Sequence, residues 1–309
     1  MNDELIIIRT IHFAATAITI GALIFRIAVE KPALRSAGAD TVVRSHTLRV
    51  AWIGLGAATV SGVIWFLVQA AAMSGLSFKE MIASNVLSKV VSDTRFGFIA
   101  EIRLALAMLL AACLAYDGVE QTLWPALASA LGLIGAIAWA GHGGSTMGPA
   151  GWLHLLADVL HLLASAAWIG GLVPLGLLLA ESRRSAVWGS IAQNVTRRFS
   201  TIGILSVGCL LATGVINTWS LVGSLDVLIS TEYGRLLILK IMLFAGLVGT
   251  ATVNRLRLMP ILALPAGSEA YLNALRQLER NSLIELALGL AIFAIVGVLG
   301  TIHPSFHQG

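Results

Sequence analysis

The amino-acid sequence predicts an all-α integral membrane protein, and three observations carry that prediction. Of the 309 residues, 57% are apolar and only 12% are charged, whereas about a quarter of the residues in soluble domains are charged. The mean hydropathy is +0.88. Eight apolar stretches are each long enough to cross about 30 Å of hydrocarbon at 1.5 Å per residue. Because only helices satisfy their own backbone hydrogen bonds in lipid at this spacing, we expect a helical bundle.

The eight predicted spans are distributed along the whole chain. They cover residues 5–28, 49–72, 96–116, 122–141, 152–180, 199–222, 233–254 and 281–302. The one long outer loop, 73–95, is expected to lie at the membrane surface as a short amphipathic helix. The net charge of +4 does not indicate a nucleic-acid partner, because the arginines lie in short loops between apolar runs, where they report topology. The partner that composition predicts is the lipid bilayer.

Orientation follows from the basic residues, which accumulate in cytoplasmic loops. With the N-terminus outside, twelve of them fall in inner loops: Lys31, Arg35, Arg44, Arg49, Arg183, Arg184, Arg197, Arg198, Arg255, Arg257, Arg276 and Arg280. Only four fall outside: Lys79, Lys89, Arg95 and Arg235. The sequence therefore predicts that both termini lie outside the cytoplasm.

The chain also repeats itself at low similarity. HFAATAITIGAL at 12–23 resembles HLLASAAWIGGL at 161–172, so that a histidine precedes a glycine by nine residues in both. TRFGFIAEIRLALAML at 94–109 resembles TEYGRLLILKIMLFAG at 231–246, which aligns Arg103 with Lys240. SGVIWFLV at 61–68 resembles TGVINTWSLV at 213–222. We interpret this as two four-helix repeats, 1–148 and 149–309. Each has an even number of spans, so both enter the membrane in the same direction.

One predicted span carries a polar seam. In WLHLLADVLHLLASAAWIGG at 152–171, the residues His154, Asp158 and His161 fall within about 60° of one another at 100° per residue. Ser165 and Trp168 continue the same stripe. Lipid penalises such a face, so it must face protein or water, and ionisable groups inside a membrane indicate function.

The predicted topology brings several histidines to the outer half of the bundle. Imidazole is a good ligand for copper, zinc and iron, and a nearby thioether favours Cu(I). The candidate metal ligands are His12, His142, His154, His161 and Met147. Asp158, Arg103, Lys240 and Asn217 are candidates to orient these ligands or to carry a proton or charge beside them. A single histidine in a helix is more often a packing residue, and only their convergence favours a metal or haem site.

These motifs, taken together and in order, carry a family resemblance. AWAGHGG, WLHLLADVLHLLASAAWIGGLVPL, EYGRLLILKIMLF, VNRLRL and ERNSLIELALGLAIFAIVGVLGT resemble the copper resistance protein D family of bacterial inner-membrane proteins, over essentially the whole chain. The resemblance implies eight transmembrane helices, copper handling and a periplasmic copper carrier of the CopC type as partner. It places His142, His154, Asp158 and His161 in the matching motif.

Two functions remain open at this stage. The first is a copper-binding protein of copper homeostasis that accepts copper ion from the periplasmic side and moves it across the membrane, rather than an enzyme. The inward route, past Cys209, Met242 or Glu285, cannot be traced in the sequence. The alternative is a membrane redox protein that binds haem b, because paired histidines on neighbouring helices also hold haem iron. His12 with His161 or His154 would then be the axial ligands.

Overall fold

The computed structural model describes residues 2–34, 40–116, 122–140, 149–183, 187–265 and 267–302. Within these residues the chain forms helices joined by short turns, and no strand occurs among them. The all-α prediction is therefore confirmed.

Helices of the first half run from α1 to α7. Their bounds are α1 (Asn2–Phe25), the π-helical turn η1 (Arg26–Glu30), α2 (Lys31–Leu34), α3 (Asp40–Ser74), α4 (Phe78–Ala83), α5 (Val86–Asp93), α6 (Arg95–Ala115) and α7 (Leu123–Ala140). Helices of the second half run from α8 to α14. Their bounds are α8 (Pro149–Ser165), the π-helical turn η4 (Ala166–Gly170), α9 (Gly171–Ser182), α10 (Val187–Val222), α11 (Leu225–Ser230), α12 (Glu232–Val253), the π-helical turn η5 (Asn254–Leu258), α13 (Met259–Ile261) and α14 (Glu269–Leu299).

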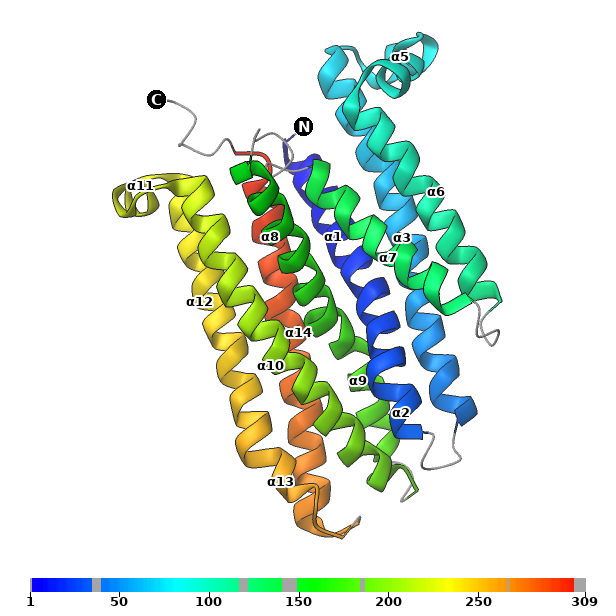
Figure 1. Ribbon diagram of the computed structural model, residues 1–309, viewed down its shortest axis with the longest axis vertical. Coiled ribbons are helices and arrows are strands. Elements are labelled where there is room, and N and C mark those ends of the chain that lie inside the picture. The colour runs from blue at the N-terminus through cyan, green and yellow to red at the C-terminus, as the bar shows by residue number, and fades with distance from the viewer. Residues whose placement is uncertain are drawn as a thin grey trace.

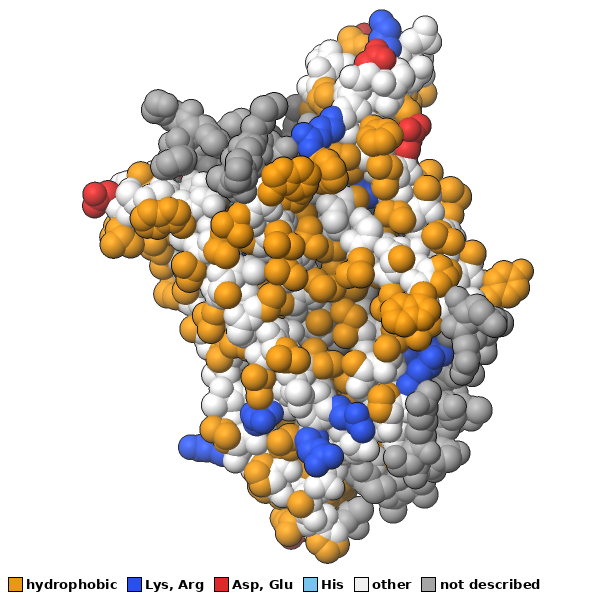
Figure 2. Space-filling model, viewed as in Figure 1, with side chains coloured by type: hydrophobic (Ala, Val, Ile, Leu, Met, Phe, Trp, Pro, Cys, Tyr) orange, Lys and Arg blue, Asp and Glu red, His pale blue; other side chains and the backbone are white. Residues whose placement is uncertain are grey.

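Seven helical runs among the described residues are long and apolar enough to cross a membrane. They account for all the predicted spans except 122–141, which corresponds to the shorter apolar helix Leu123–Trp139. Large apolar side chains cover the middle of the face in Figure 2, and Lys and Arg side chains gather below them. The chain is therefore a multi-pass membrane protein.

Two helical runs form the centre of the bundle. The run α1–η1–α2 and the run α8–η4–α9 are each 67% buried over their most apolar stretch, against 11% for the run that contains α12. Figure 1 shows α3, α6 and α7 on one side of α1 and α10 and α12 on the other. α1 begins, and α14 ends, at the same end of the bundle. We call this the outer end, after the predicted orientation.

The two central runs touch at a pair of glycines. A Cβ atom added to Gly170 would lie 2.7 Å from the carbonyl carbon of Ala17 and 3.1 Å from Cα of Gly21. A Cβ at Gly21 would in turn collide with the backbone of Gly170. Small residues at such crossings let transmembrane helices approach closely. The histidine-to-glycine spacing noted in both halves thus ends, in each, at this contact.

Short surface helices precede α6 and α12 in a matching way. Thr94 caps α6 by accepting a hydrogen bond from the backbone N–H of Gly97, at 3.0 Å. Thr231 caps α12 by accepting one from Gly234, also at 3.0 Å. A side chain at either glycine would collide with the backbone of the short helix before it, α5 or α11. The predicted helix in 73–95 is present as the pair α4 and α5.

Candidate metal site and inner cavity

The polar seam of α8 contains a buried imidazole with an unused nitrogen. His154 is 4% exposed, and its Nε2 has no hydrogen-bond partner among the described residues. One helical turn away, Asp158 Oδ2 lies 3.8 Å from that Nε2. Asp158 Oδ1 accepts a hydrogen bond of 2.7 Å from Asn217 Nδ2 on α10, which leaves Asn217 Oδ1 buried and, among the described residues, without a partner. Two buried polar atoms of this group, His154 Nε2 and Asn217 Oδ1, are therefore left without a hydrogen-bond partner among the described residues.

His161, two turns further into the bundle than His154, is held in one tautomer. Its Nδ1 lies 2.9 Å from Thr213 Oγ1 on α10, and that hydroxyl donates its proton to the carbonyl of Cys209 at 2.7 Å. Since the hydroxyl proton is already used, Nδ1 of His161 must be the donor to Thr213. The lone pair is then on Nε2. Histidines that bind metals are supported in this way, with the second ring N–H donated to a fixed acceptor.

Lys240 on α12 brings a positive charge to the same region. It interacts electrostatically with both Asp158 and His161. The seam therefore combines one carboxylate and one ammonium group with two imidazoles. A cation at Asp158 would have to be accommodated beside Lys240, because like charges repel strongly in a low-dielectric interior.

The first half contains a related arrangement around His12. This imidazole is 5% exposed, and its Nδ1 lies 2.9 Å from the carbonyl of Ala58 and 3.2 Å from Ser61 Oγ on α3. Arg103 on α6 donates to its Nε2, and the guanidinium carbon of Arg103 stands 5.1 Å from the ring centroid of Trp65. Arginine only donates, so Nδ1 of His12 is protonated and Nε2 accepts. His12 and His161 are thus each hydrogen-bonded through Nδ1 to the next long helix, α3 or α10. In the first half, the lone pair on His12 Nε2 accepts a hydrogen bond from the Arg103 guanidinium.

The predicted ligands do not all come together. His154 lies beside Asp158 and Asn217, His161 contacts α10, and His12 contacts α3 and α6. Among the residues that the structure describes, no three His, Cys, Asp or Glu side chains form a group that could hold a metal ion. His142 and Met147, the other predicted ligands, lie outside the described residues.

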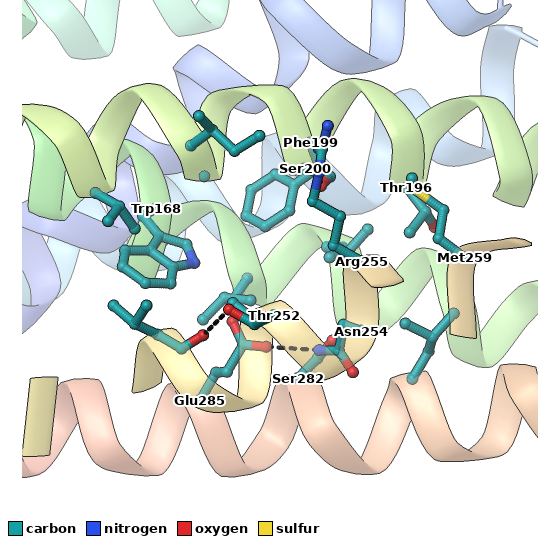
Figure 3. A pocket seen from close by; sticks show the side chains of 18 of the residues that line it. Trp168, Thr196, Phe199, Ser200, Thr252, Asn254, Arg255, Met259, Ser282 and Glu285 are labelled. Atoms are coloured by element: carbon teal, nitrogen blue, oxygen red, sulfur yellow. Dashed lines mark hydrogen bonds between the residues drawn. The ribbon is translucent and has the colours of Figure 1, made fainter. Parts of the chain in front are cut away.

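A second polar region lies deeper in the second half, around a cavity of about 190 Å³. Figure 3 shows side chains of α10, η4, η5 and α14 facing this space. Glu285, which is 3% exposed, accepts a 2.6 Å hydrogen bond from Asn254 Nδ2, and the indole of Trp168 stands beside it. Asn254 Oδ1 in turn accepts from Asn281 Nδ2 at 2.6 Å.

The sequence marks Trp168 and Glu285 separately, but it does not predict that they line one cavity. The stripe of His154, Asp158, His161 and Ser165 ends at Trp168, and an ionisable group in the last span is itself a signal. That Trp168 reaches Glu285 depends on how α14 packs against η4, which no local pattern encodes.

The fold and these buried polar groups define a polytopic helical membrane protein that carries buried ionisable side chains within its spanning helices. Comparison with known proteins then identifies the family. Residues 1–152 match the copper resistance protein D-like N-terminal domain, and residues 193–299 match copper resistance protein D. The chain belongs to the copper resistance protein D family.

Three curated relatives are similar to the chain. Copper resistance protein D of Pseudomonas syringae pv. tomato is 28% identical over 314 residues, which cover 100% of both chains. Inner membrane protein YebZ of Escherichia coli K12 is 26% identical over 97% of this chain and 98% of the relative. Copper transport protein CutJ of Bacillus subtilis is 27% identical over 76% of this chain and 43% of its own length. No solved structure matches.

The family membership confirms the predicted resemblance, and it supports copper homeostasis and a multi-pass protein of the inner membrane. The haem b alternative gains no support from the described residues or from these relatives. The lone pair of His12 that would face a haem iron is turned to Arg103 instead.

Proposed function

We propose that the protein takes up copper from the periplasmic side at the seam of α8 and moves it toward the cytoplasm. The observation that carries this proposal is the unpartnered Nε2 of buried His154, 3.8 Å from a carboxylate oxygen of Asp158. Leaving a buried polar atom unsatisfied costs about 1–3 kcal/mol. Two ligand atoms at this separation can close on one metal ion with little movement of the helix.

Copper is the cargo that these groups and the relatives favour together. Among divalent first-row metals, Cu²⁺ is bound most tightly by sites of nitrogen and oxygen ligands. His161 has the supported tautomer of a metal ligand and completes the seam below Asp158. The Bacillus relative is named a copper transport protein, and the Pseudomonas relative a copper resistance protein.

The segment before α8 extends the proposed site. His142 and Met147 precede Pro149, the first residue of α8, in sequence and would supply additional ligands where copper enters. A CopC-like periplasmic carrier would deliver the ion there. In the first half, His12 would join copper binding only when Arg103 leaves its Nε2.

The proposed membrane arrangement has eight spans in two parallel four-helix repeats, 1–148 and 149–309, with both termini periplasmic. Support comes from the matching threonine caps of α6 and α12 and from the matching ties of His12 and His161. α7 would be the eighth span, since its 18 residues extend about 27 Å.

Copper titration of the purified protein tests the site. We expect His154→Ala and Asp158→Asn each to weaken copper binding at least tenfold, whereas His46→Ala, a histidine near the start of α3 and far from the seam, should bind as the wild type does. Thermal unfolding of each variant establishes that it is folded. Equal affinity in folded His154→Ala and wild-type protein would rule out the seam as the copper site. Uptake into vesicles tests direction, and intact binding without inward flux would reject transport.

A further inference from the structure

The strongest unassigned feature is the carboxyl group of Glu285 in the inner cavity. No salt bridge to it occurs within the described residues, since Arg255, the other charged residue of the cavity wall, donates to Ser200 Oγ at 2.7 Å. Its two contacts, Asn254 Nδ2 and the Trp168 indole, are neutral donors. A carboxylate within a membrane-spanning helix without a counter-cation is costly, and such groups mark ion or proton pathways.

The donor set around Glu285 decides between a metal ion and a proton. Among the described residues, no group of three His, Cys, Asp or Glu includes it. Asn254 Oδ1 is already used as an acceptor for Asn281. One carboxylate is too few ligands for a metal ion, which usually takes three or four protein ligands. A proton needs only a free lone pair on one carboxylate oxygen.

The cavity supplies the medium through which a proton would travel. Its volume of about 190 Å³ has room for several water molecules, each of which occupies about 30 Å³ in the liquid. Thr196 lines the same cavity, and its buried Oγ1 has no partner among the described residues, so water is the natural donor or acceptor for it. Figure 3 shows Thr196 and Glu285 on opposite sides of this space.

Two irregular turns place the key residues. Trp168 lies in η4 and Asn254 opens η5, and both turns are π-helical. Such turns occur frequently at functional sites, because the extra residue redirects side chains and frees backbone groups. The same run of helix carries His154 and Asp158 at the outer end and Trp168 at the cavity, so one seam joins the two regions.

We propose that Glu285 is a proton-binding site that exchanges with the cytoplasmic side through water in this cavity, and that it releases its proton when a cation occupies the outer seam. The first part is independent of the proposed copper function, and the second part rests on it. On release, the carboxylic O–H bond breaks, the proton passes to cavity water and the carboxylate keeps the electron pair. Arg255, whose guanidinium is turned to Ser200, is the other charged group of the described wall; η4, α9, α10, α12 and α13 contribute neutral lining residues.

The size of the coupling follows from the length of the seam. Trp168, which stands beside Glu285, is ten residues beyond Asp158, a rise of about 15 Å along the helix, and we take this rise as the separation of the two acids. With an effective dielectric constant of about 20, one added positive charge at that distance raises the proton concentration needed to half-protonate Glu285 about sixfold.

Infrared difference spectroscopy of the full-length protein in vesicles, recorded as the pH is lowered, tests both parts. We expect a carboxylic-acid carbonyl band that disappears in Glu285→Gln, shifts in Glu285→Asp and persists in Ser282→Ala, a cavity-wall variant that keeps the carboxyl group. With copper bound, the proton concentration at the midpoint of this band's titration should be about sixfold higher. A pH-dependent band unchanged in Glu285→Gln, or no titrating band in wild type, overturns the proton site. A midpoint that stays fixed while copper is bound overturns the release. If wild-type protein binds no copper, the proposed function fails, and the band alone still decides the proton site.

Discussion

Replacing Gly170 by alanine should strongly destabilise the protein, because the added methyl group would meet backbone of the other central helix. The new Cβ would lie 2.7 Å from the carbonyl carbon of Ala17, and nearer still to its oxygen. Ordinary contact begins at 3.4 Å, so the two central helices must separate by at least 0.7 Å (3.4 minus 2.7). A gap of that size loses about a quarter to a half of the dispersion energy of neighbouring contacts.

We expect Gly170→Ala to lower the free energy of unfolding by about 3 kcal/mol, near the upper end of the range for overpacked sites. The reason is that the new methyl group meets backbone atoms, which cannot rotate away as a side chain can. This loss of stability corresponds to a decrease of roughly 100-fold in the ratio of folded to unfolded protein. Reversible unfolding in mixed micelles, followed by tryptophan fluorescence, measures it. Gly176→Ala in α9 is the matched control, since nothing lies within 4 Å of its Cβ, and there alanine should stabilise the helix by up to about 1 kcal/mol. Equal stability of the two variants would refute the close crossing.

Two further predictions concern the seam and the outer surface. Thr213→Val removes the acceptor of His161 Nδ1–H and should weaken copper binding about tenfold or more, measured by competition titration; an affinity equal to that of Thr201→Val, on the same helix, would contradict this support. The pKa of Glu80 is lowered because the hydroxyl and backbone N–H of Ser77 donate to its carboxylate. This capping box therefore stabilises α4 above the ordinary pKa of glutamate and is lost as the pH falls through the lowered value. The protection of α4 amides, measured against the intrinsic exchange rate at each pH, should fall on acidification, and Ser77→Ala should abolish that dependence; an unchanged pH profile in the variant would exclude the box as its cause.

The fold was accessible from sequence because lipid imposes a simple rule on composition. Long apolar runs must be helical, and each of the seven described runs overlaps one predicted span, although several run on beyond it, as Glu269–Leu299 does against the predicted 281–302. α7 is the exception in length, because its apolar helix ends at Trp139 and glycine-rich residues follow it. Within one helix, the sequence also predicted which side chains share a face, since His154, Asp158 and His161 lie on the face that the 100° period predicts.

Partners between helices could not be predicted in the same way. Whether Asn217 meets Asp158, or Thr213 meets His161, depends on the rotation and offset of α10 against α8, which are set by packing of the whole bundle. The repeat aligned Arg103 with Lys240, yet periodicity could not tell that Arg103 would occupy the lone pair of His12. The inner cavity is hidden for the same reason, because its wall is drawn from seven elements, η4, α9, α10, α12, η5, α13 and α14.

The extra residue in the π-helical turn η4 sets the rotation of the outer seam relative to the inner cavity. A π turn holds one residue more than an α turn, and each residue advances a helix by about 100°. Deleting any one residue from 166–170 would restore a regular helix that still spans the bilayer, with every ligand side chain retained. It would also rotate the outer face a quarter turn away from the cavity. A one-residue gap at this position in an otherwise similar chain would therefore mark a protein whose two regions no longer share a face.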